Sequence, residues 1–148
     1  MVVSIFEVSA LVGSGVTAGV LFAVALSVLP ALFAMPADRY VYTHQLLGRN
    51  WDPTMPVVVL TSFALDVLLA VLGDGSSRLL FVLGAVLLLG VSVVSHFCNV
   101  PLNRGVKKLD PERVPADWVD PRPVWRRWHL LRTGLAIAAL VLNAVAVG

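Results

Sequence analysis

Three histidines are the residues of this sequence best suited to acid–base or metal chemistry. They are His44, His96 and His129, and the chain contains no others. Imidazole gains or loses a proton near neutral pH, and in its neutral form it is a common ligand of iron, copper and zinc. No two of the three have the close spacing of a local metal motif such as HxxxH. Only the fold can therefore bring them together.

Other polar side chains accompany the histidines. In the last apolar stretch Trp125, His129 and Arg132 are spaced i, i+4, i+7, so they share one face of a helix. A similar polar stripe in the preceding stretch comprises Ser92, Ser95, His96 and Asn99. Arg132 lies about one turn inside its apolar stretch, where a guanidinium is costly unless it is paired or functional. We expect the amide oxygen of Asn99 or Asn103 to accept a hydrogen bond from it.

Three interpretations of this polar group are open. In the first, the side chains only hydrogen-bond to loop backbone and lipid headgroups at the membrane interface. In the second, His44, His96 and His129 bind a single metal ion. In the third, no metal takes part: one histidine removes a proton, and Arg132 together with Asn99 stabilises the resulting anion at low dielectric.

The composition decides which kind of fold must position these residues. The chain has 148 residues, of which 58% are hydrophobic and only 14% charged, and its mean hydropathy is +0.87. A water-soluble domain of this length does not need so much apolar surface, so we expect one domain, residues 1–148, that faces a lipid bilayer. Cys98 is the only cysteine, which excludes an intramolecular disulfide.

Four apolar stretches are close to the roughly 20 residues with which a helix crosses a membrane. They are about Val8–Phe33, Met55–Leu72, Leu79–Phe97 and Leu130–Val147. Prolines mark their ends: Pro30 and Pro36 bracket the exit from the first, Pro53 and Pro56 open the second, and Pro101 stops the third. The segment Ala37–Gly48 can form a short helix that lays His44 against the mouth of the bundle. The sequence therefore predicts an all-α integral membrane four-helix bundle.

The basic residues predict how this bundle is oriented. Ten of the 11 Lys and Arg residues fall at one end: Arg39, Arg49, Arg104, Lys107, Lys108, Arg113, Arg122, Arg126, Arg127 and Arg132. Only Arg78 falls at the other end, so we expect the loops Ala34–Thr54 and Cys98–His129 in the cytoplasm and both termini outside the plasma membrane. The basic residues thus mark topology, and we expect no nucleic-acid partner. The alternating helix direction also brings all three histidines to one side.

Asp66 is a separate candidate because it lies inside the second apolar stretch, nearer the other end. An ionisable residue at such a depth is a functional candidate by default. Asn143 should reach a similar depth, and Arg78 can extend toward the carboxyl group. We therefore expect a structural polar contact, with a proton path as the alternative. Small residues at Gly15–Gly19 and Gly134–Ala138 predict close helix packing within the bundle. The sequence also leaves open that the protein forms a homo-oligomer.

Several short elements along nearly the whole chain resemble those of a known family. They are His44-Gln45, the run Asp52-Pro53-Thr54-Met55-Pro56, the Asn-x-Pro-x-Asn element Asn99–Asn103, and Trp125-x-x-Trp128-His129-x-x-Arg132. Together they resemble the small four-helix membrane proteins that include the anthrone oxygenases, many of which are described only as a domain of unknown function. The resemblance implies dioxygen-dependent oxidation of an anthrone to a quinone, often in polyketide pathways. It also implies that Asn99, Asn103, Trp128 and Arg132 are site residues.

The residues themselves are compatible with this chemistry. An anthrone has an acidic CH group, so a positioned base can generate an electron-rich enolate that reacts with dioxygen without a redox cofactor. The sequence has no dinucleotide fingerprint and no haem-attachment motif. We therefore expect either no cofactor or a histidine-bound metal. The candidate catalytic residues are His44, His96, His129 and Arg132, and the candidate substrate-binding residues are Asn99, Asn103, Trp125 and Trp128. The alternative class is a non-enzymatic scaffold, accessory subunit or small-molecule permease, which needs no closed pocket.

Overall fold

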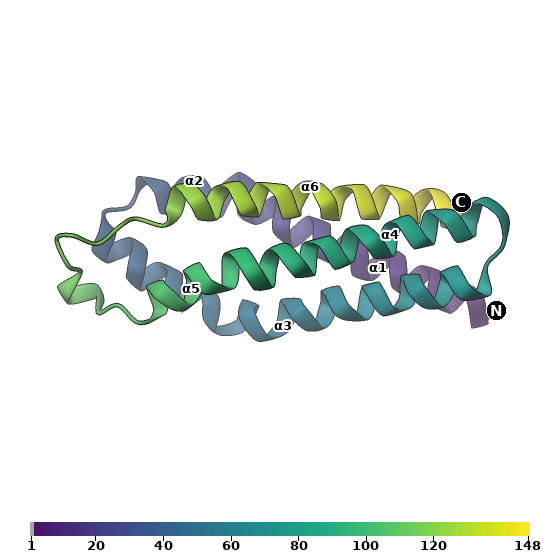
Figure 1. The fold of residues 1–148 in the computed structure, drawn as a ribbon, viewed down its shortest axis with the longest axis horizontal. Coiled ribbons are helices and arrows are strands. Elements are labelled where there is room, and N and C mark those ends of the chain that lie inside the picture. Colours follow the sequence, from purple (N-terminus) through teal and green to yellow (C-terminus); the bar gives the residue numbers. More distant parts are fainter. Residues whose placement is uncertain (1) are drawn as a thin grey trace.

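The chain forms a bundle of long helical rods (Figure 1). The computed structural model describes residues 2–148. The first rod comprises α1 (Val2–Ala23), the π-helical turn η1 (Val24–Val28) and α2 (Leu29–Ala34), and the second is α3 (Ala37–Leu72). The third comprises α4 (Gly75–Val94), the π-helical turn η2 (Ser95–Asn99) and α5 (Val100–Lys107); a short 3₁₀ turn, η3 (Pro111–Arg113), and α6 (Arg122–Val147) follow.

Four helical segments are long and apolar enough to cross a membrane: Val3–Ala34, Ala37–Leu72, Gly75–Lys107 and Arg122–Val147. Many large apolar side chains on them point outward, for example Val71 and Phe97, each 71% exposed. Lipid can cover such side chains, whereas water cannot do so favourably. The predicted all-α architecture with four potential membrane spans is therefore confirmed.

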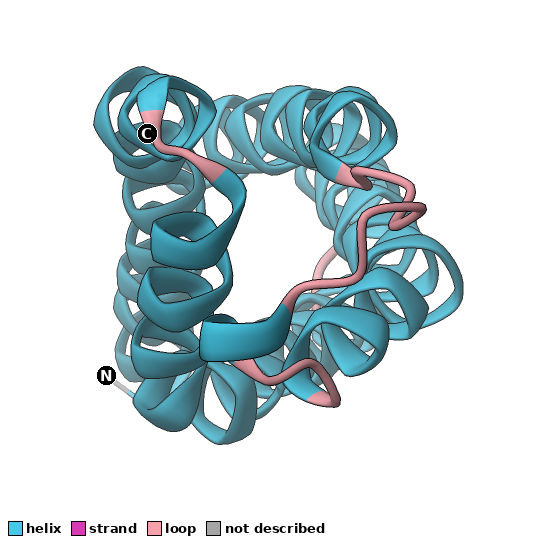
Figure 2. Cartoon of the chain, turned by 90° about the vertical axis from the view of Figure 1, so that its left-hand side faces the viewer, coloured by secondary structure: helices cyan, strands magenta, loops and turns pink. Residues whose placement is uncertain are grey.

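The rods follow one another around a ring. The first and third rods each pack against α3 and α6, and Figure 2, which looks along the bundle, shows the helices around a common axis. Both termini lie at one end of the bundle (Figure 1). The connection before α3 and the long segment before α6 lie at the opposite end, which we call the loop end. Consecutive helices joined in this way form an up-and-down bundle.

The prolines do not end the helices as the sequence predicts. Pro53 and Pro56 lie inside α3, which runs without a break from Ala37, so most of the expected loop before the second span is helix. Each proline lacks an N–H group and leaves one carbonyl oxygen of the preceding turn without its helical donor. Arg49 and Trp51 are exposed here. Water or headgroups can thus satisfy the freed carbonyl groups.

Pro30 and Pro101 are accommodated differently, by the two π-helical turns. In η1 the N–H group of Leu29 bonds the carbonyl of Val24, five residues back, and proline is the next residue. In η2 the N–H group of Val100 bonds Ser95 in the same way, again just before proline. The wider turn moves the carbonyl with which the proline ring would clash. The third rod therefore continues to Lys107 and does not stop at Pro101.

Close helix packing occurs at glycines other than those the sequence indicates. A Cβ atom at Gly13 would collide with the hydroxyl of Ser62, so α1 and α3 pack closely there. At Gly19 and Gly134, apart from the adjacent residues and the backbone of the same helix, no atom lies within 4 Å of a Cβ position. Because the tight contacts are between particular side chains, the small-residue spacing alone does not locate them.

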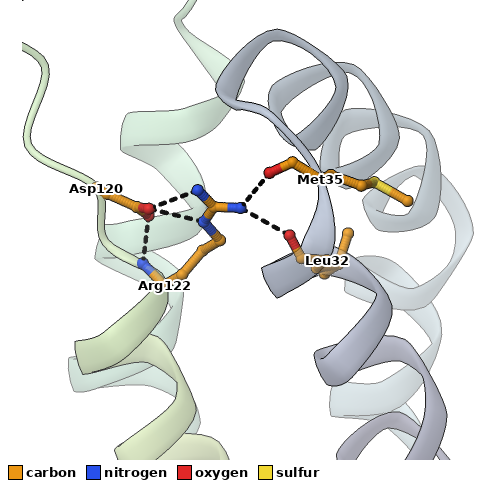
Figure 3. Close-up of polar contacts among 4 residues, drawn as sticks. All are labelled: Leu32, Met35, Asp120 and Arg122. Carbon is orange, nitrogen blue, oxygen red and sulfur yellow. Dashed lines mark hydrogen bonds and ion pairs between the residues drawn. The ribbon is translucent and has the colours of Figure 1, made fainter.

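Arg122 fastens the segment before α6 to the end of the first rod (Figure 3). Its guanidinium donates to the carbonyl oxygens of Leu32 and Met35, both at 2.7 Å, and to the carboxylate of Asp120. It also lies 4.8 Å from the ring centroid of Tyr40. Partial burial favours the neutral acid, but the hydrogen bonds and charge of Arg122 hold the pKa of the Asp120 carboxyl below its usual value. These contacts therefore fix the start of α6 to the end of the first rod at the loop end.

Candidate functional site

A cavity of about 690 Å³ lies between the rods toward the loop end. Small-molecule sites usually have volumes of roughly 300–1,000 Å³. Apolar side chains such as Leu21, Val24 and Val59 form much of its wall. Its polar lining includes His44, His96, His129, Asn99, Asn103, Ser95, Trp125 and Arg132. The predicted convergence of the three histidines is confirmed at the level of this shared cavity.

Both π-helical turns contribute to the cavity wall. Val24 and Val28 from η1, and Ser95, His96 and Asn99 from η2, are among the lining residues. A π turn adds one residue to the turn and shifts the side chains that follow, which is why such turns are frequent at functional sites. Several lining residues on α3 and η2 are exposed, including Leu60 at 51% and Phe97 at 71%. The cavity therefore opens between these two elements.

Asn103 connects Trp125 to His44. Its Oδ1 atom accepts a hydrogen bond from Trp125 Nε1 at 2.9 Å and lies 3.2 Å from His44 Nε2. An indole N–H can only donate, so the amide atom it contacts must be the oxygen. That oxygen can only accept, and His44 Nε2 must therefore carry the proton. His44 Nδ1 is then a free base, and it is buried without a hydrogen-bond partner among the described residues.

The same reasoning fixes the tautomer of His129, which is fully buried. Its Nε2 atom lies 3.0 Å from the carbonyl oxygen of Leu21, which only accepts, so Nε2 carries the proton. Its Nδ1 atom accepts from Nε and Nη2 of Arg132, at 3.2 and 2.9 Å. The ring stacks on Trp125 with a centroid distance of 5.0 Å. His129 is thus neutral with both nitrogens engaged, and it positions Arg132.

Arg132 reaches the cavity without a carboxylate partner. Besides His129, its guanidinium donates to the hydroxyl of Ser95 at 3.1 Å. The ion pairs found in residues 2–148 are Lys107–Asp52 and Arg122–Asp120. Asp52 is the only acidic residue in the cavity lining, and it is already paired. Among the described residues the guanidinium therefore has no carboxylate in direct contact, and Asp52 acts on it only from a distance, so an anionic ligand beside it would be favoured.

The expected partners of Arg132 were wrong. We expected Asn99 or Asn103 to accept its hydrogen bonds, but Ser95 and His129 do so. Asn99 instead donates from Nδ2 to the carbonyl oxygen of Trp125 at 3.3 Å. It is fully buried, and its Oδ1 atom has no partner among the described residues. Both asparagines thus hold Trp125.

Two predicted site residues lie differently from the rest. His96 lines the cavity but is exposed on its rim, with its ring against Phe97 at a centroid distance of 5.0 Å. Trp128 does not line the cavity and is 38% exposed. It directly precedes buried His129, and consecutive residues of a helix lie about 100° apart around its axis, so Trp128 points away from the side of α6 on which His129 is buried. The structure therefore does not support a substrate contact for Trp128; a tryptophan at this position suits anchoring at the membrane interface.

The histidines share the cavity but do not form a metal site by themselves. Within residues 2–148, no group of three or more His, Cys, Asp or Glu side chains is placed to hold a metal ion. His129 could become a ligand only by giving up Arg132 or Leu21. The donor set thus does not fit the three-histidine interpretation.

The rim carries an ion pair that the sequence did not indicate. Lys107 of α5 donates to Asp52 of α3, and both side chains are more than one third exposed. A Cβ atom at Gly48 would lie 3.2 Å from Lys107 Cε, so glycine leaves the room for this lysine to reach α3. Opposite charges so far apart in sequence give no local signal.

Comparison with known proteins identifies one family. The family model described as anthrone oxygenase matches residues 44–142. The matched region begins at His44 and contains every polar residue of the cavity described above. No curated protein and no solved structure matches the chain.

Proposed function

The chain belongs to the anthrone oxygenase family, and from this premise we propose that it is a membrane enzyme that oxidises an anthrone-type aromatic compound with dioxygen. The substrate is a hydrophobic polycyclic phenol, as in aromatic polyketide pathways, and the product is the corresponding quinone. The observation that carries the proposal is Arg132, a cation on the cavity wall without a carboxylate partner. An enolate formed in the cavity would supply the missing negative charge.

The proposed reaction needs a base and an anion site. A base removes a proton from the CH₂ group opposite the anthrone carbonyl, leaving an enolate. The enolate gives an electron to dioxygen and a C–O bond forms at that carbon. Loss of water from the resulting hydroperoxide leaves the second carbonyl group. One oxygen atom of dioxygen is thus retained in the quinone, and the other leaves as water with the two hydrogen atoms of the CH₂ group.

His44 is the residue to which we assign the base. Its Nε2 proton is held by Asn103, which leaves Nδ1 as an unprotonated nitrogen in a neutral ring. Protein atoms cover Nδ1 in the structure, so the bound substrate has to displace part of that cover. Catalytic hydrogen bonds commonly form only in the complex. Asn99 Oδ1, also buried without a partner, is a second acceptor suited to a phenolic hydroxyl.

Arg132 stabilises the anion in this proposal. His129 accepts from two of its nitrogens and Ser95 from the third, so the guanidinium is fixed before charge develops. Fixed donors in a site without bulk water are worth far more than mobile ones in water. Because apolar side chains form much of the cavity wall, the cavity also suits a polycyclic substrate that partitions from lipid.

A non-enzymatic scaffold is the alternative. A protein-binding scaffold would present its polar residues on a flat, exposed surface. Buried Asn99 and His129 are instead arranged around a cavity of small-molecule size. The cavity thus favours a small-molecule site.

Turnover of an anthrone by the purified protein tests the proposed function. We expect the full chain in lipid nanodiscs to consume one dioxygen per quinone formed, and to do so after exhaustive chelation as well as before. Oxygen uptake and quinone absorbance measure this directly, with protein-free nanodiscs as the control for spontaneous oxidation. Quinone formation no faster than in empty nanodiscs would exclude the activity for that substrate, and loss of activity on chelation would exclude the metal-free route.

We also propose that the loop end faces the cytoplasm, because nearly all basic residues lie there. Cysteine substituted for Gly75, in the turn at the opposite end, should react with a membrane-impermeant thiol reagent added to intact cells. Cysteine substituted for Val119, which is 85% exposed in the segment before α6, should react only after the membrane is opened; Val106 of α5 is buried and would not be labelled from either side. A Cys98→Ser background removes the native thiol. The reverse labelling pattern would contradict the orientation.

A further inference from the structure

A second buried polar group lies in the half of the bundle away from the cavity. Asp66 of α3 and Asn143 of α6 are both fully buried, and neither lines the cavity. Asn143 Nδ2 lies 3.0 and 3.1 Å from the two carboxyl oxygens. Gly84 of α4 completes the group: a Cβ atom there would lie 2.6 Å from Asn143 Oδ1 and 2.8 Å from Asp66 Oδ2. The two oxygens thus occupy the space of a missing side chain.

No positive charge faces this carboxyl group. Glu7 is the only charged residue of α1, Arg78 in the first turn is the only one of α4, and α6 has none beyond Arg132. Arg78 is exposed and forms no ion pair with Asp66 within the described chain, so Asn143 alone makes the polar contact that the sequence predicts. An ionised carboxylate would therefore be buried without a counter-ion, and such groups in proteins take up a proton instead.

Asn143 provides the acceptor for that proton. Its Oδ1 atom is buried, and no donor reaches it in residues 2–148. A protonated carboxyl can donate to this oxygen while its other oxygen accepts from Nδ2, which satisfies both side chains. We propose that Asp66 is a proton-binding site: its carboxyl is neutral in the folded bundle, and its proton is hydrogen-bonded to Asn143 Oδ1.

A metal cation suits the group less well than a proton. Hard divalent cations take about six or more oxygen ligands, and here only the oxygens of Asp66 and Asn143 converge. The amide N–H group of Asn143 also occupies the edge of the carboxyl that a cation would need. The neutral pair joins α3 to α6 beside Gly84 and leaves no charge buried between these helices.

Infrared spectroscopy of the full chain in nanodiscs tests the bound proton. At pH 8 the exposed carboxyls are ionised, and we expect one C=O stretching band of a neutral carboxylic acid, absent from Asp66→Asn. In Asn143→Leu the band should persist at higher frequency, because the carboxyl loses its hydrogen bonds. If Asp66→Asn does not fold, ¹³C-labelled aspartate in the wild-type protein must shift the band to lower frequency. Absence of the band, its survival in Asp66→Asn, its insensitivity to the label, or its removal by sodium or potassium would overturn the proposal.

The thermal stability of two glycine variants, Gly84→Ala and Gly134→Ala, tests the packing of the Asp66–Asn143 pair independently. Gly84→Ala should lower the midpoint of thermal unfolding, because its Cβ atom would press on both oxygens. Gly134→Ala, where no other atom lies within 4 Å, is the matched control and should unfold at or above the wild-type midpoint. Equal midpoints for the two variants would contradict the packed pair. Neither measurement depends on turnover, so the outcome is independent of the proposed oxygenase activity.

Discussion

Replacing Arg132 with glutamine should lower the rate of anthrone oxidation by about 100-fold to 1,000-fold, the usual effect of losing one fixed donor to a developing anion. The guanidinium lines the cavity without a carboxylate partner and is held by His129 and Ser95. Arg132→Lys should also be impaired, because an ammonium group keeps the charge but cannot donate in the fixed planar geometry of the guanidinium. Steady-state turnover in nanodiscs, with folded protein quantified in parallel, measures both effects.

Arg126→Lys is the matched control for this prediction. Arg126 is exposed and lies over the ring of Phe33, outside the cavity. It should keep wild-type turnover. If Arg132→Lys were equally active, Arg132 would have no place in the mechanism. If Arg132→Lys failed to insert into the membrane while Arg126→Lys inserted normally, Arg132 would instead be needed for assembly.

Replacing His44 with glutamine should lower turnover by about 100-fold to 10,000-fold, the range for loss of a general base. Glutamine can still donate to Asn103, so Trp125 should keep its place, but glutamine has no basic nitrogen. The pH dependence of turnover distinguishes a base from a structural residue. The acidic limb of the wild-type profile should disappear in His44→Gln, and the residual rate should rise with hydroxide concentration. External imidazole should restore part of the activity.

His96→Gln serves as the comparison for His44. Its ring lies on the exposed rim, and we expect a much smaller loss than in His44→Gln. If His96→Gln lost more turnover than His44→Gln, the base would be assigned to His96 on the cavity rim. A His44→Gln enzyme with the wild-type pH profile would show that His44 only supports Trp125.

Periodicity and hydropathy were sufficient to predict the four helices. Apolar runs of about 20 residues have few alternatives in lipid, because unpaired backbone groups are too costly there. The ends were not predictable in the same way. Pro53 lies inside α3 and Pro101 follows a π turn, since exposed carbonyl groups at the first site and a wider turn at the second remove the cost of proline. Where each helix ends at a proline therefore depends on the surrounding backbone and solvent exposure, which the local sequence does not specify.

The polar residues of the cavity were predictable as a group, but their individual partners were not. Helix direction alone brought the histidines to one end, and the i, i+4, i+7 spacing placed Trp125, His129 and Arg132 on one face. Arg132 donates to Ser95, whereas Asn99 and Asn103 bond to Trp125 instead. The outward position of Trp128 depends on how α6 is rotated in the bundle. Such details are set by packing and carry no local pattern.

The ionisation state of a bound anthrone under strict exclusion of oxygen tests the central claim most directly. The enolate absorbs at longer wavelength than the neutral ketone, so the spectrum of the complex reports proton removal without turnover. The proposal predicts the enolate spectrum with the wild-type protein after chelation, the neutral spectrum with His44→Gln, and a weaker enolate signal with Arg132→Gln. A neutral spectrum with the wild-type protein, or an undiminished enolate signal with both variants, would contradict it.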